Sequence, residues 1–282
     1  MIQDIAPHTY DITYQKETAR TTDIILNYTK AGVLCRIMKK GLFFLTAEEA
    51  SGVIPDVYDK ANYLFQIDDQ RYYEIPGMEE REWEGYEYVP IESLRQMYPR
   101  WKVFAAITGH QIHKWYTENA FCGKCGADMQ PHGRDRAMLC PACGFTAYPR
   151  ISPCVIVGVI HKEELLLTRY STTHSSFQKY GLIAGYVEIG ESLEEAVRRE
   201  VMEEVGLKVK NIRYYKSQPW SFSDTLLLGL FCEVEGETTV TLDEEELSEA
   251  VWFDRKNLPA ERSDAELSLT GEMMEAFMGG RV

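Results

Sequence analysis

Apolar and polar positions alternate over short distances in the first third of the chain. Apolar runs such as TDIILNY, GVLCRIM, GLFFLTA, NYLFQIDD and YEYVPI are separated by Gly, Pro and Asp. Short runs with such breaks are typical of strands joined by turns. The pattern up to about residue 95 therefore predicts a small, β-rich mixed domain that is mostly antiparallel.

The pattern then changes to the period of a helix that leads into the first pair of cysteines. Its apolar stripe lies at Val103, Ala106, Ile107 and His110, with Trp115 further along. His110 and His113 lie three residues apart on this helix and could in principle both ligate a metal. No carboxylate partner lies near them in the sequence, so packed or surface histidines are favoured.

Strands and helices alternate from residue 151 onward. The expected strands are YPRISPCVIVGVI, LLLTRY, LLLGLFCEV and EAVWFD, and the expected helices are residues 193–205 and the segment SDAELSLTGEMMEAF. Such alternation predicts a sheet covered by helices. The whole chain is expected to be α+β, with an N-terminal β-rich domain at 1–117, a cysteine module at 118–148 and a third domain at 149–282.

Four of the seven cysteines form two close pairs. Cys122 and Cys125 make one C-x-x-C, Cys140 and Cys143 make the second, and each pair is followed by a glycine. Four thiolates on two short turns suit tetrahedral Zn²⁺, and the spacing predicts a zinc ribbon. Because four protein ligands leave no open position, this zinc is expected to be structural and to brace the two domains.

Two other interpretations of the cysteines fit the sequence less well. Two disulfides, or four unrelated core thiols, would explain neither the paired spacing of the cysteines nor the cytosolic character expected of the chain. The remaining thiols are expected in the core, because they lie in apolar runs: Cys35, Cys154 and Cys232.

Charge and hydropathy narrow the class of protein. The formal net charge of −14 argues against broad electrostatic binding to nucleic acid or anionic membranes. A substrate with phosphates would then need divalent cations as a bridge. The first residues lack the pattern of a signal peptide, and no apolar run reaches the length of a membrane span, so a soluble cytoplasmic protein is expected.

The glutamate-rich segment is well specified as a helix. Ser192 followed by Glu195 is a capping-box pattern, and Gly206 is a plausible stop. The expected buried stripe is Leu193, Ala196, Val197, Val201 and Val205.

Glu200, Glu203 and Glu204 share an adjacent face of this helix. Three close carboxylates repel one another unless a cation lies among them, and oxygen ligands suit Mg²⁺ or Mn²⁺. The face is therefore interpreted as a metal site, with Arg199 holding Glu191 by a bidentate contact. The alternative is a charged, solvated helix face.

The segment also resembles the signature box of the Nudix hydrolases, without departures. The matching residues are Gly185, Glu191, Arg199, Glu200, Val201, Glu203, Glu204, Gly206 and Leu207. The resemblance implies an α/β/α sandwich with a mixed sheet and metal-dependent hydrolysis of a nucleoside diphosphate linked to another group. It also implies that Glu200, Glu203 and Glu204 are the catalytic metal ligands.

A second motif, SQPWSFSDT at 217–225, resembles SQPWPFPxS of the NADH pyrophosphatase (NudC-type) subgroup. The resemblance implies cleavage of NAD(H) to NMN(H) and AMP, and removal of NAD caps from RNA 5′ ends. Ser221 and Ser223 replace prolines, which removes rigidity. ADP-ribose, diadenosine polyphosphates and coenzyme A therefore stay open as alternative substrates, and a non-catalytic nucleotide sensor is an alternative from another class.

The subgroup resemblance also carries over further residues. The implied substrate contacts are Tyr148, Tyr186, Ser217, Gln218, Trp220 and Phe222, with the two tyrosines stacking on a base. Glu246 corresponds to a further catalytic glutamate, a metal ligand or general base, although Glu244 or Glu245 could hold that role. A homodimer is expected from the same resemblance.

Overall fold

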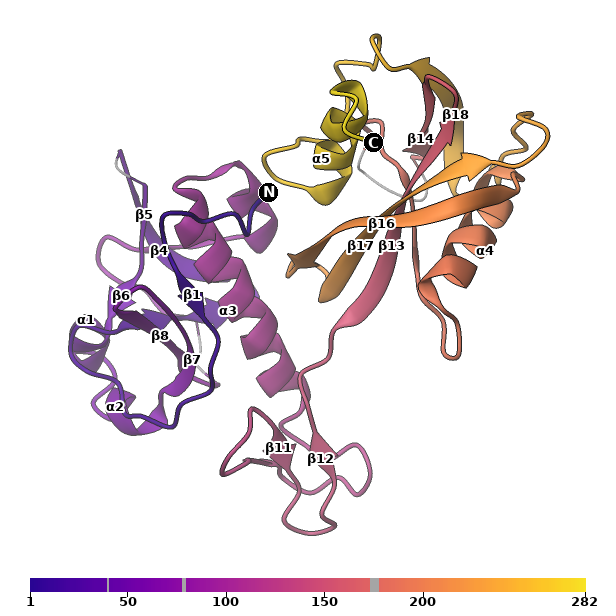
Figure 1. Cartoon of the computed structure of the whole chain (residues 1–282). Coiled ribbons are helices and arrows are strands. Elements are labelled where there is room, and N and C mark those ends of the chain that lie inside the picture. Colours follow the sequence, from indigo (N-terminus) through magenta and orange to yellow (C-terminus); the bar gives the residue numbers. More distant parts are fainter. Residues whose placement is uncertain (40, 78–79, 173–177) are drawn as a thin grey trace. The chain divides into compact units, whose positions relative to one another are not determined.

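The computed structural model describes residues 1–39, 41–77, 80–172 and 178–282 (Figure 1). The chain divides into two compact units. The N-terminal unit contains Ile2–Arg150 and Ser221–Ser223, and the C-terminal unit contains Ile151–Trp220 and Asp224–Val282 with Met1. Within the described ranges, no helix is both long enough and apolar enough to cross a membrane.

The N-terminal unit is built on two sheets of short strands. One has the order β1-β7-β8-β2-β6, and the other has the order β3-β4-β5 with β9 paired to β4. The strands are β1 Tyr10–Asp11, β2 Ile24–Leu26, β3 Tyr28–Thr29, β4 Gly32–Met38, β5 Gly41–Phe43, β6 Leu45–Thr46, β7 Asn62–Ile67, β8 Gln70–Glu74 and β9 Glu87–Val89. Since β2 and β8 are parallel while the other pairs are antiparallel, the expected β-rich mixed domain is confirmed.

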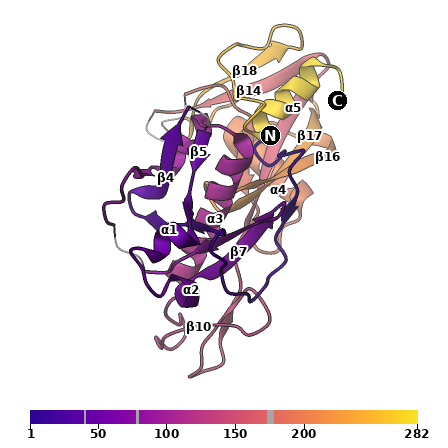
Figure 2. The same ribbon diagram turned by 90° about the vertical axis from the view of Figure 1, so that its left-hand side faces the viewer.

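Helices complete this unit. The short ones are α1 Ala47–Ser51, α2 Val57–Lys60 and the 3₁₀ turn η1 Ile91–Gln96. The long helix α3, Arg100–Glu118, packs against β7 and β8 (Figure 1), and Figure 2 shows it again beside β7. The predicted apolar stripe of this helix is buried except at His110, which is half-buried.

The cysteine module is a small antiparallel sheet that belongs to the N-terminal unit. Its strands are β10 Gln130–Pro131, β11 Met138–Leu139 and β12 Thr146–Ala147. The Arg136 guanidinium donates to the backbone carbonyls of Leu64 and Tyr63 in β7. The module is thereby tied to the first sheet, and its bracing of two domains stays a prediction.

The C-terminal unit has one mixed sheet with the order β16-β17-β13-β14-β18, and β15 pairs with β13. Its strands are β13 Ser152–His161, β14 Glu164–Tyr170, β15 Ile183–Tyr186, β16 Val209–Trp220, β17 Thr225–Val234 and β18 Leu247–Asp254. β13 and β17 are parallel and the other pairs are antiparallel. Helix α4, Leu193–Val205, and helix α5, Leu269–Met278, both contact β13.

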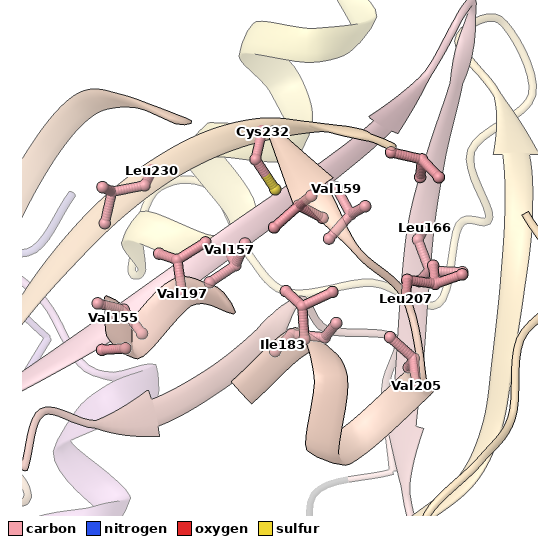
Figure 3. Close-up of a cluster of buried hydrophobic side chains, with 14 of the residues drawn as sticks. Val155, Val157, Val159, Leu166, Ile183, Val197, Val205, Leu207, Leu230 and Cys232 are labelled. Carbon is pink, nitrogen blue, oxygen red and sulfur yellow. The ribbon is translucent and has the colours of Figure 1, made fainter. Parts of the chain in front are cut away.

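Alternation along β13 divides the core into two layers, because successive side chains of a strand point to opposite faces. The layer with α4 contains Val155, Val157, Val159, Ala196, Val197, Val201 and Val205 (Figure 3). The layer with α5 contains Cys154, Ile156, Ile160, Leu269, Met273, Met274 and Phe277. The α/β/α sandwich with a mixed sheet is therefore confirmed.

Several elements of the C-terminal unit differ from the sequence expectation, and one of them is the strand β15, which was not predicted. The C-terminal helix begins at Leu269 rather than near residue 263, because Ser268 caps it by accepting from the Gly271 amide. The strand β16 was not predicted. Most of its residues are exposed or half-buried, and two register shifts interrupt its pairing, so its sequence lacks a clear period of two.

Candidate active site and candidate zinc centre

Helix α4 begins and ends where local chemistry requires. The Ser192 hydroxyl accepts from the Glu195 amide, and the Glu195 carboxylate accepts from the Ser192 amide at 2.8 Å. Gly206 ends the helix in the left-handed region, at φ 68°. The predicted helix 193–205 is thus confirmed, together with both of its boundary signals.

Strand β15 brings the box glycine against the acidic face of α4. A Cβ atom added to Gly185 would lie 1.9 Å from Cδ of Glu200, far inside van der Waals contact. Glycine leaves room here for the Glu200 carboxylate, which a larger side chain would displace.

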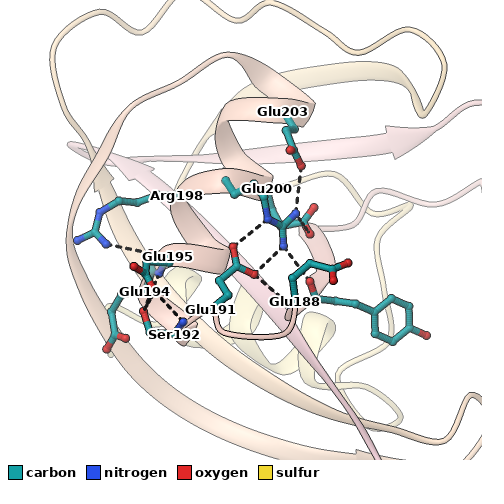
Figure 4. A network of polar contacts seen from close by, with 10 residues as sticks. Glu188, Glu191, Ser192, Glu194, Glu195, Arg198, Glu200 and Glu203 are labelled. Atoms are coloured by element: carbon teal, nitrogen blue, oxygen red, sulfur yellow. Dashed lines mark hydrogen bonds and ion pairs between the residues drawn. The ribbon is translucent and has the colours of Figure 1, made fainter.

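Arg199 is the centre of a network of carboxylates (Figure 4). Its Nε and Nη2 donate to the two oxygens of Glu191 at 2.8 and 2.9 Å, as predicted. Its Nη1 donates to Glu200 at 2.7 Å and to Glu203 at 3.1 Å, and Nη2 also donates to the Tyr186 carbonyl. One guanidinium thus joins the loop before α4 to the acidic face and to the end of β15.

Glu204 is the buried member of the acidic face. Its residue exposure is 3%, and neither carboxylate oxygen has a hydrogen-bond partner among the described residues. Burial raises the pKa of Glu204 to about 8, with further contributions from the charges of Glu200 and Glu246. The backbone amide of Ala184 lowers the pKa and so offsets part of this rise. Its position relative to the carboxylate is nevertheless outside hydrogen-bonding geometry. Two unpartnered oxygens in a buried site favour a bound cation.

Two residues from other parts of the C-terminal unit lie near the acidic face: Glu246, in a turn, and Tyr170, on a strand. Burial raises the pKa of both Glu200 and Glu204, and the charge of Glu246, directly before β18, raises both further, whereas Glu244 and Glu245 are exposed. The structure therefore brings Glu246 to the site. Tyr170, at the end of β14, was missed by sequence reasoning; its pKa is raised by burial and by Glu204, Glu246 and Glu200. No local motif marks it, because only the sheet places it there.

The chemistry of this donor set fits a hard divalent cation. Glu200, Glu203, Glu204 and Glu246 offer carboxylate oxygens alone, the ligands that Mg²⁺ and Mn²⁺ prefer. The carboxylates are not gathered around one point, however. In the part of the chain that the structure describes, the four cysteines are the one group that brings three or more ligand atoms within 4.8 Å of one another. Glu200 and Glu203 instead share the Nη1 atom of Arg199 as their positive partner.

The cysteine cluster has the geometry of a closed metal site. The Sγ atoms of Cys122 and Cys143 are 3.6 Å apart, and those of Cys125 and Cys140 are 3.5 Å apart. Burial opposes ionisation of Cys122, but the amides of Lys124 and Cys125 outweigh it and lower the pKa of that thiol to about 7.

The cysteines cannot all ionise without a cation. The Ala127 amide lowers the pKa of the Cys125 thiol, but hydrogen bonds with Cys140 and Cys143 raise it to about 12. A divalent cation among the four sulfurs removes this conflict, and the tetrahedral sulfur set fits Zn²⁺.

The SQPW segment forms the end of β16. Gln218 is fully buried; its Nε2 donates to the Leu267 carbonyl at 3.0 Å, and its Oε1 accepts from the Leu269 amide at 2.6 Å. These contacts hold the beginning of α5 to the sheet. Trp220 packs against the core layer of α5, so the segment also has a role in the fold.

Other predicted substrate contacts are placed as follows. Tyr148 is 63% exposed in the N-terminal unit, and Tyr186 is 52% exposed at the end of β15. Ser217 is half-buried in β16 beside Leu228 of β17, and Phe222 lies in the turn that follows β16. Their contacts with a substrate stay predictions.

Comparison with known proteins supplies the context for this geometry. Residues 151–270 match the family model described as NUDIX domain. A NAD-capped RNA hydrolase NudC from Haemophilus influenzae is 35% identical over 214 residues, which cover 75% of this chain and 80% of that protein.

Two further similarities cover less of the chain. A NAD-capped RNA hydrolase NudC from Salmonella heidelberg is 43% identical over 152 residues; the match covers 54% of this chain and 58% of that relative's length. A crystal structure of a NUDIX hydrolase from Nitrosomonas europaea is 21% identical with a TM-score of 0.47, and the match covers 57% of this chain and 93% of that chain.

Proposed function

This chain belongs to the Nudix family and to its NudC-type branch, and on that basis we propose that it hydrolyses the pyrophosphate bond of NAD(H). The products are NMN(H) and AMP, and the cofactor is a divalent cation, Mg²⁺ or Mn²⁺. The observation that carries the proposal is the buried Glu204 carboxylate. Both of its oxygens lack a hydrogen-bond partner among the described residues, beside Glu200 and Glu246.

The acidic cluster would hold the catalytic cation through Glu200, Glu203, Glu204 and Glu246. A divalent cation, when bound, supplies electrophilic stabilisation to the phosphoryl oxygens. Arg199 keeps the loop before α4 in place through Glu191 and orients the Glu200 carboxylate. Glu246 comes from a different loop and is also our candidate for the base that takes a proton from the attacking water.

The substrate would be recognised through exposed aromatic rings. Tyr186 is exposed directly after Gly185, and its carbonyl accepts from Arg199 at 2.9 Å. A base stacked on such a ring would contribute about 1–3 kcal/mol. Tyr148, Ser217, Trp220 and Phe222 are proposed as further substrate contacts. Gln218 would act on substrate only through the segment that it holds.

A NAD-capped RNA 5′ end is a second proposed substrate, because the similar proteins from Haemophilus and Salmonella are named as NAD-capped RNA hydrolases. The net charge of −14 disfavours binding along the RNA backbone, so the cap would be the recognised part. We also propose a structural zinc at the four cysteines, a homodimer and a cytoplasmic location. Light scattering of the purified chain tests the homodimer.

Product analysis is the experiment that tests the reaction. The chain is incubated with NADH and with Mg²⁺ or Mn²⁺, and release of AMP and NMNH is measured by chromatography. A kcat/KM series over NADH, NAD⁺, ADP-ribose, diadenosine polyphosphate, coenzyme A and NAD-capped RNA then ranks the substrates. A preference for a compound without nicotinamide would support the alternative raised by Ser221 and Ser223. Failure of every compound to release product would leave a nucleotide sensor.

A further inference from the structure

Helix α3 presents two histidines to one cavity of the N-terminal unit. His110 and His113 both line a cavity of about 600 Å³. Residues three apart on a helix are neighbours on its surface, with Cβ atoms about 5–6 Å apart. The two imidazoles therefore open on the same cavity.

The ring of Tyr28 contacts both imidazoles. Its centroid lies 5.5 Å from that of His110 and 5.1 Å from that of His113. Its hydroxyl donates to the Ala106 carbonyl at 2.7 Å. Tyr28 can approach α3 this closely because residue 109 is glycine, where an added Cβ would lie 2.4 Å from the Tyr28 hydroxyl oxygen. Both histidines are thus packed against one rigid aromatic ring.

Glu74 supplies the carboxylate that sequence reasoning did not find near these histidines. It ends β8 and is fully buried, and its Oε2 lies 2.8 Å from Nδ1 of His113. Its Oε1 accepts from the Asn62 side-chain amide at 2.8 Å. With Nδ1 of His113 bonded to Glu74, Nε2 is the ring nitrogen left for a ligand. A carboxylate behind the imidazole is the usual arrangement at histidine metal ligands.

The charges around the cavity favour a cation over an anion. Glu80 and Glu118 balance Lys30 and Lys114 in the lining, so these four side chains sum to zero. Glu74 adds one further negative charge behind His113. Imidazole nitrogen selects ions such as Zn²⁺, Ni²⁺ and Cu²⁺ over Mg²⁺.

We propose that His110 and His113, with Glu74 orienting His113, form a binding site for one divalent transition-metal ion, with water as the remaining ligands. The site is separate from the four cysteines and from the acidic cluster. An ion bound there would link α3 to β8 through the His113–Glu74 contact. It would stabilise the N-terminal unit by mass action, because the unfolded chain does not hold these residues together.

Ni²⁺ is the probe of choice because it does not oxidise thiols. The untagged full chain, with zinc on its cysteines and in excess Mg²⁺ to occupy carboxylate sites, is titrated with Ni²⁺ by calorimetry. X-ray absorption then identifies the ligands of the bound nickel. We expect one Ni²⁺ per chain with two imidazole ligands.

Variants test which residues bind. His110→Gln and His113→Gln should each weaken Ni²⁺ binding at least tenfold, and Glu74→Gln should weaken it about 10–100-fold. His132→Gln is the matched control, because His132 lies in the cysteine module of the same unit and should leave binding unchanged. His110→Gln leaves the His113–Glu74 pair intact, so it tests the site even if the other variants fold poorly. Nickel without imidazole ligands, or affinity unchanged in both histidine variants, would overturn the proposal.

Discussion

Gly185 leaves open the space that the Glu200 carboxylate occupies, since a Cβ atom at position 185 would lie 1.9 Å from Cδ of Glu200. The glycine and the glutamate come from different elements, β15 and α4, that contact each other. The glycine of the box therefore acts by positioning a carboxylate rather than by allowing an unusual backbone angle.

Gly185→Ala should displace the Glu200 carboxylate while the strand persists, because the crowded atoms are the end of a flexible side chain. We expect kcat to fall at least tenfold with little change in Tm. Gly181→Ala is the control, because a Cβ there would meet nothing closer than 4.0 Å. Full activity of the Gly185→Ala variant would show that Glu200 can act from another position.

Glu204→Gln removes a carboxylate that would ligate the cation, without removing any hydrogen bond that the described residues make to it. We expect kcat to fall by about 10²–10³-fold and Mn²⁺ affinity to fall, measured by kinetics and calorimetry, with folding intact. The control is Glu194→Gln, which changes an exposed glutamate in the first turn of the same helix. Equal losses in both variants would argue against a special role for Glu204.

Gln218→Ala separates a structural role from a substrate contact. Loss of its bonds to Leu267 and Leu269 leaves buried backbone groups unpaired, so we expect about 1–3 kcal/mol lower stability in urea unfolding. The KM for NADH should change little. Gln130→Ala, on the exposed strand β10, serves as the control. A raised KM with unchanged stability would return Gln218 to the substrate contacts.

Cys140→Ser should remove the metal at the cysteine cluster. Binding energy at such sites is also folding energy, so the zinc content should drop and the N-terminal unit should unfold at a lower temperature. Elemental analysis after dialysis against a weak chelator measures the first effect, and calorimetry measures the second. The control is Cys35→Ala, which changes a buried thiol on β4. This variant should lose packing contacts but keep the zinc at the four cysteines.

The carboxyl group of Glu272 should make the folding stability of the chain decrease as the pH falls into the acid range. Burial would raise the pKa of this carboxyl, but Lys216 at 2.8 Å and Tyr215 at 2.9 Å outweigh burial and lower it. The contribution of Glu272 to the free energy of unfolding is then fully present above the ordinary glutamate pKa of 4.5. It is lost as the pH falls through the lower pKa that Glu272 has in the folded chain. Glu272→Gln should cost about 1–2 kcal/mol at pH 7, and the cost should fall as the pH is lowered toward 3.

The control for Glu272 lies on the same helix. Glu275 pairs with Arg262 at 2.8 Å, but its side chain is 42% exposed. Glu275→Gln should therefore cost under about 1 kcal/mol in urea unfolding. A cost for Glu272→Gln that is the same at pH 7 and pH 3 would contradict the acid linkage.

The sequence alone predicts contacts between residues that lie close together along the chain. The capping box of α4, its Gly206 stop and the Arg199–Glu191 contact all join residues within eight positions. Once a segment is helical, backbone geometry alone decides which of its side chains meet. The cysteine pairs are similar, because each tight turn aims two thiols at the same point.

Only the tertiary structure decided which distant residues meet. Glu74 reaches His113 across 39 positions, and Gln218 reaches Leu269 across 51. Glu246 and Tyr170 join the acidic cluster because strands β18 and β14 pair in one register. Such contacts depend on how whole sheets and helices pack, and no local pattern of polar and apolar residues encodes that packing by itself.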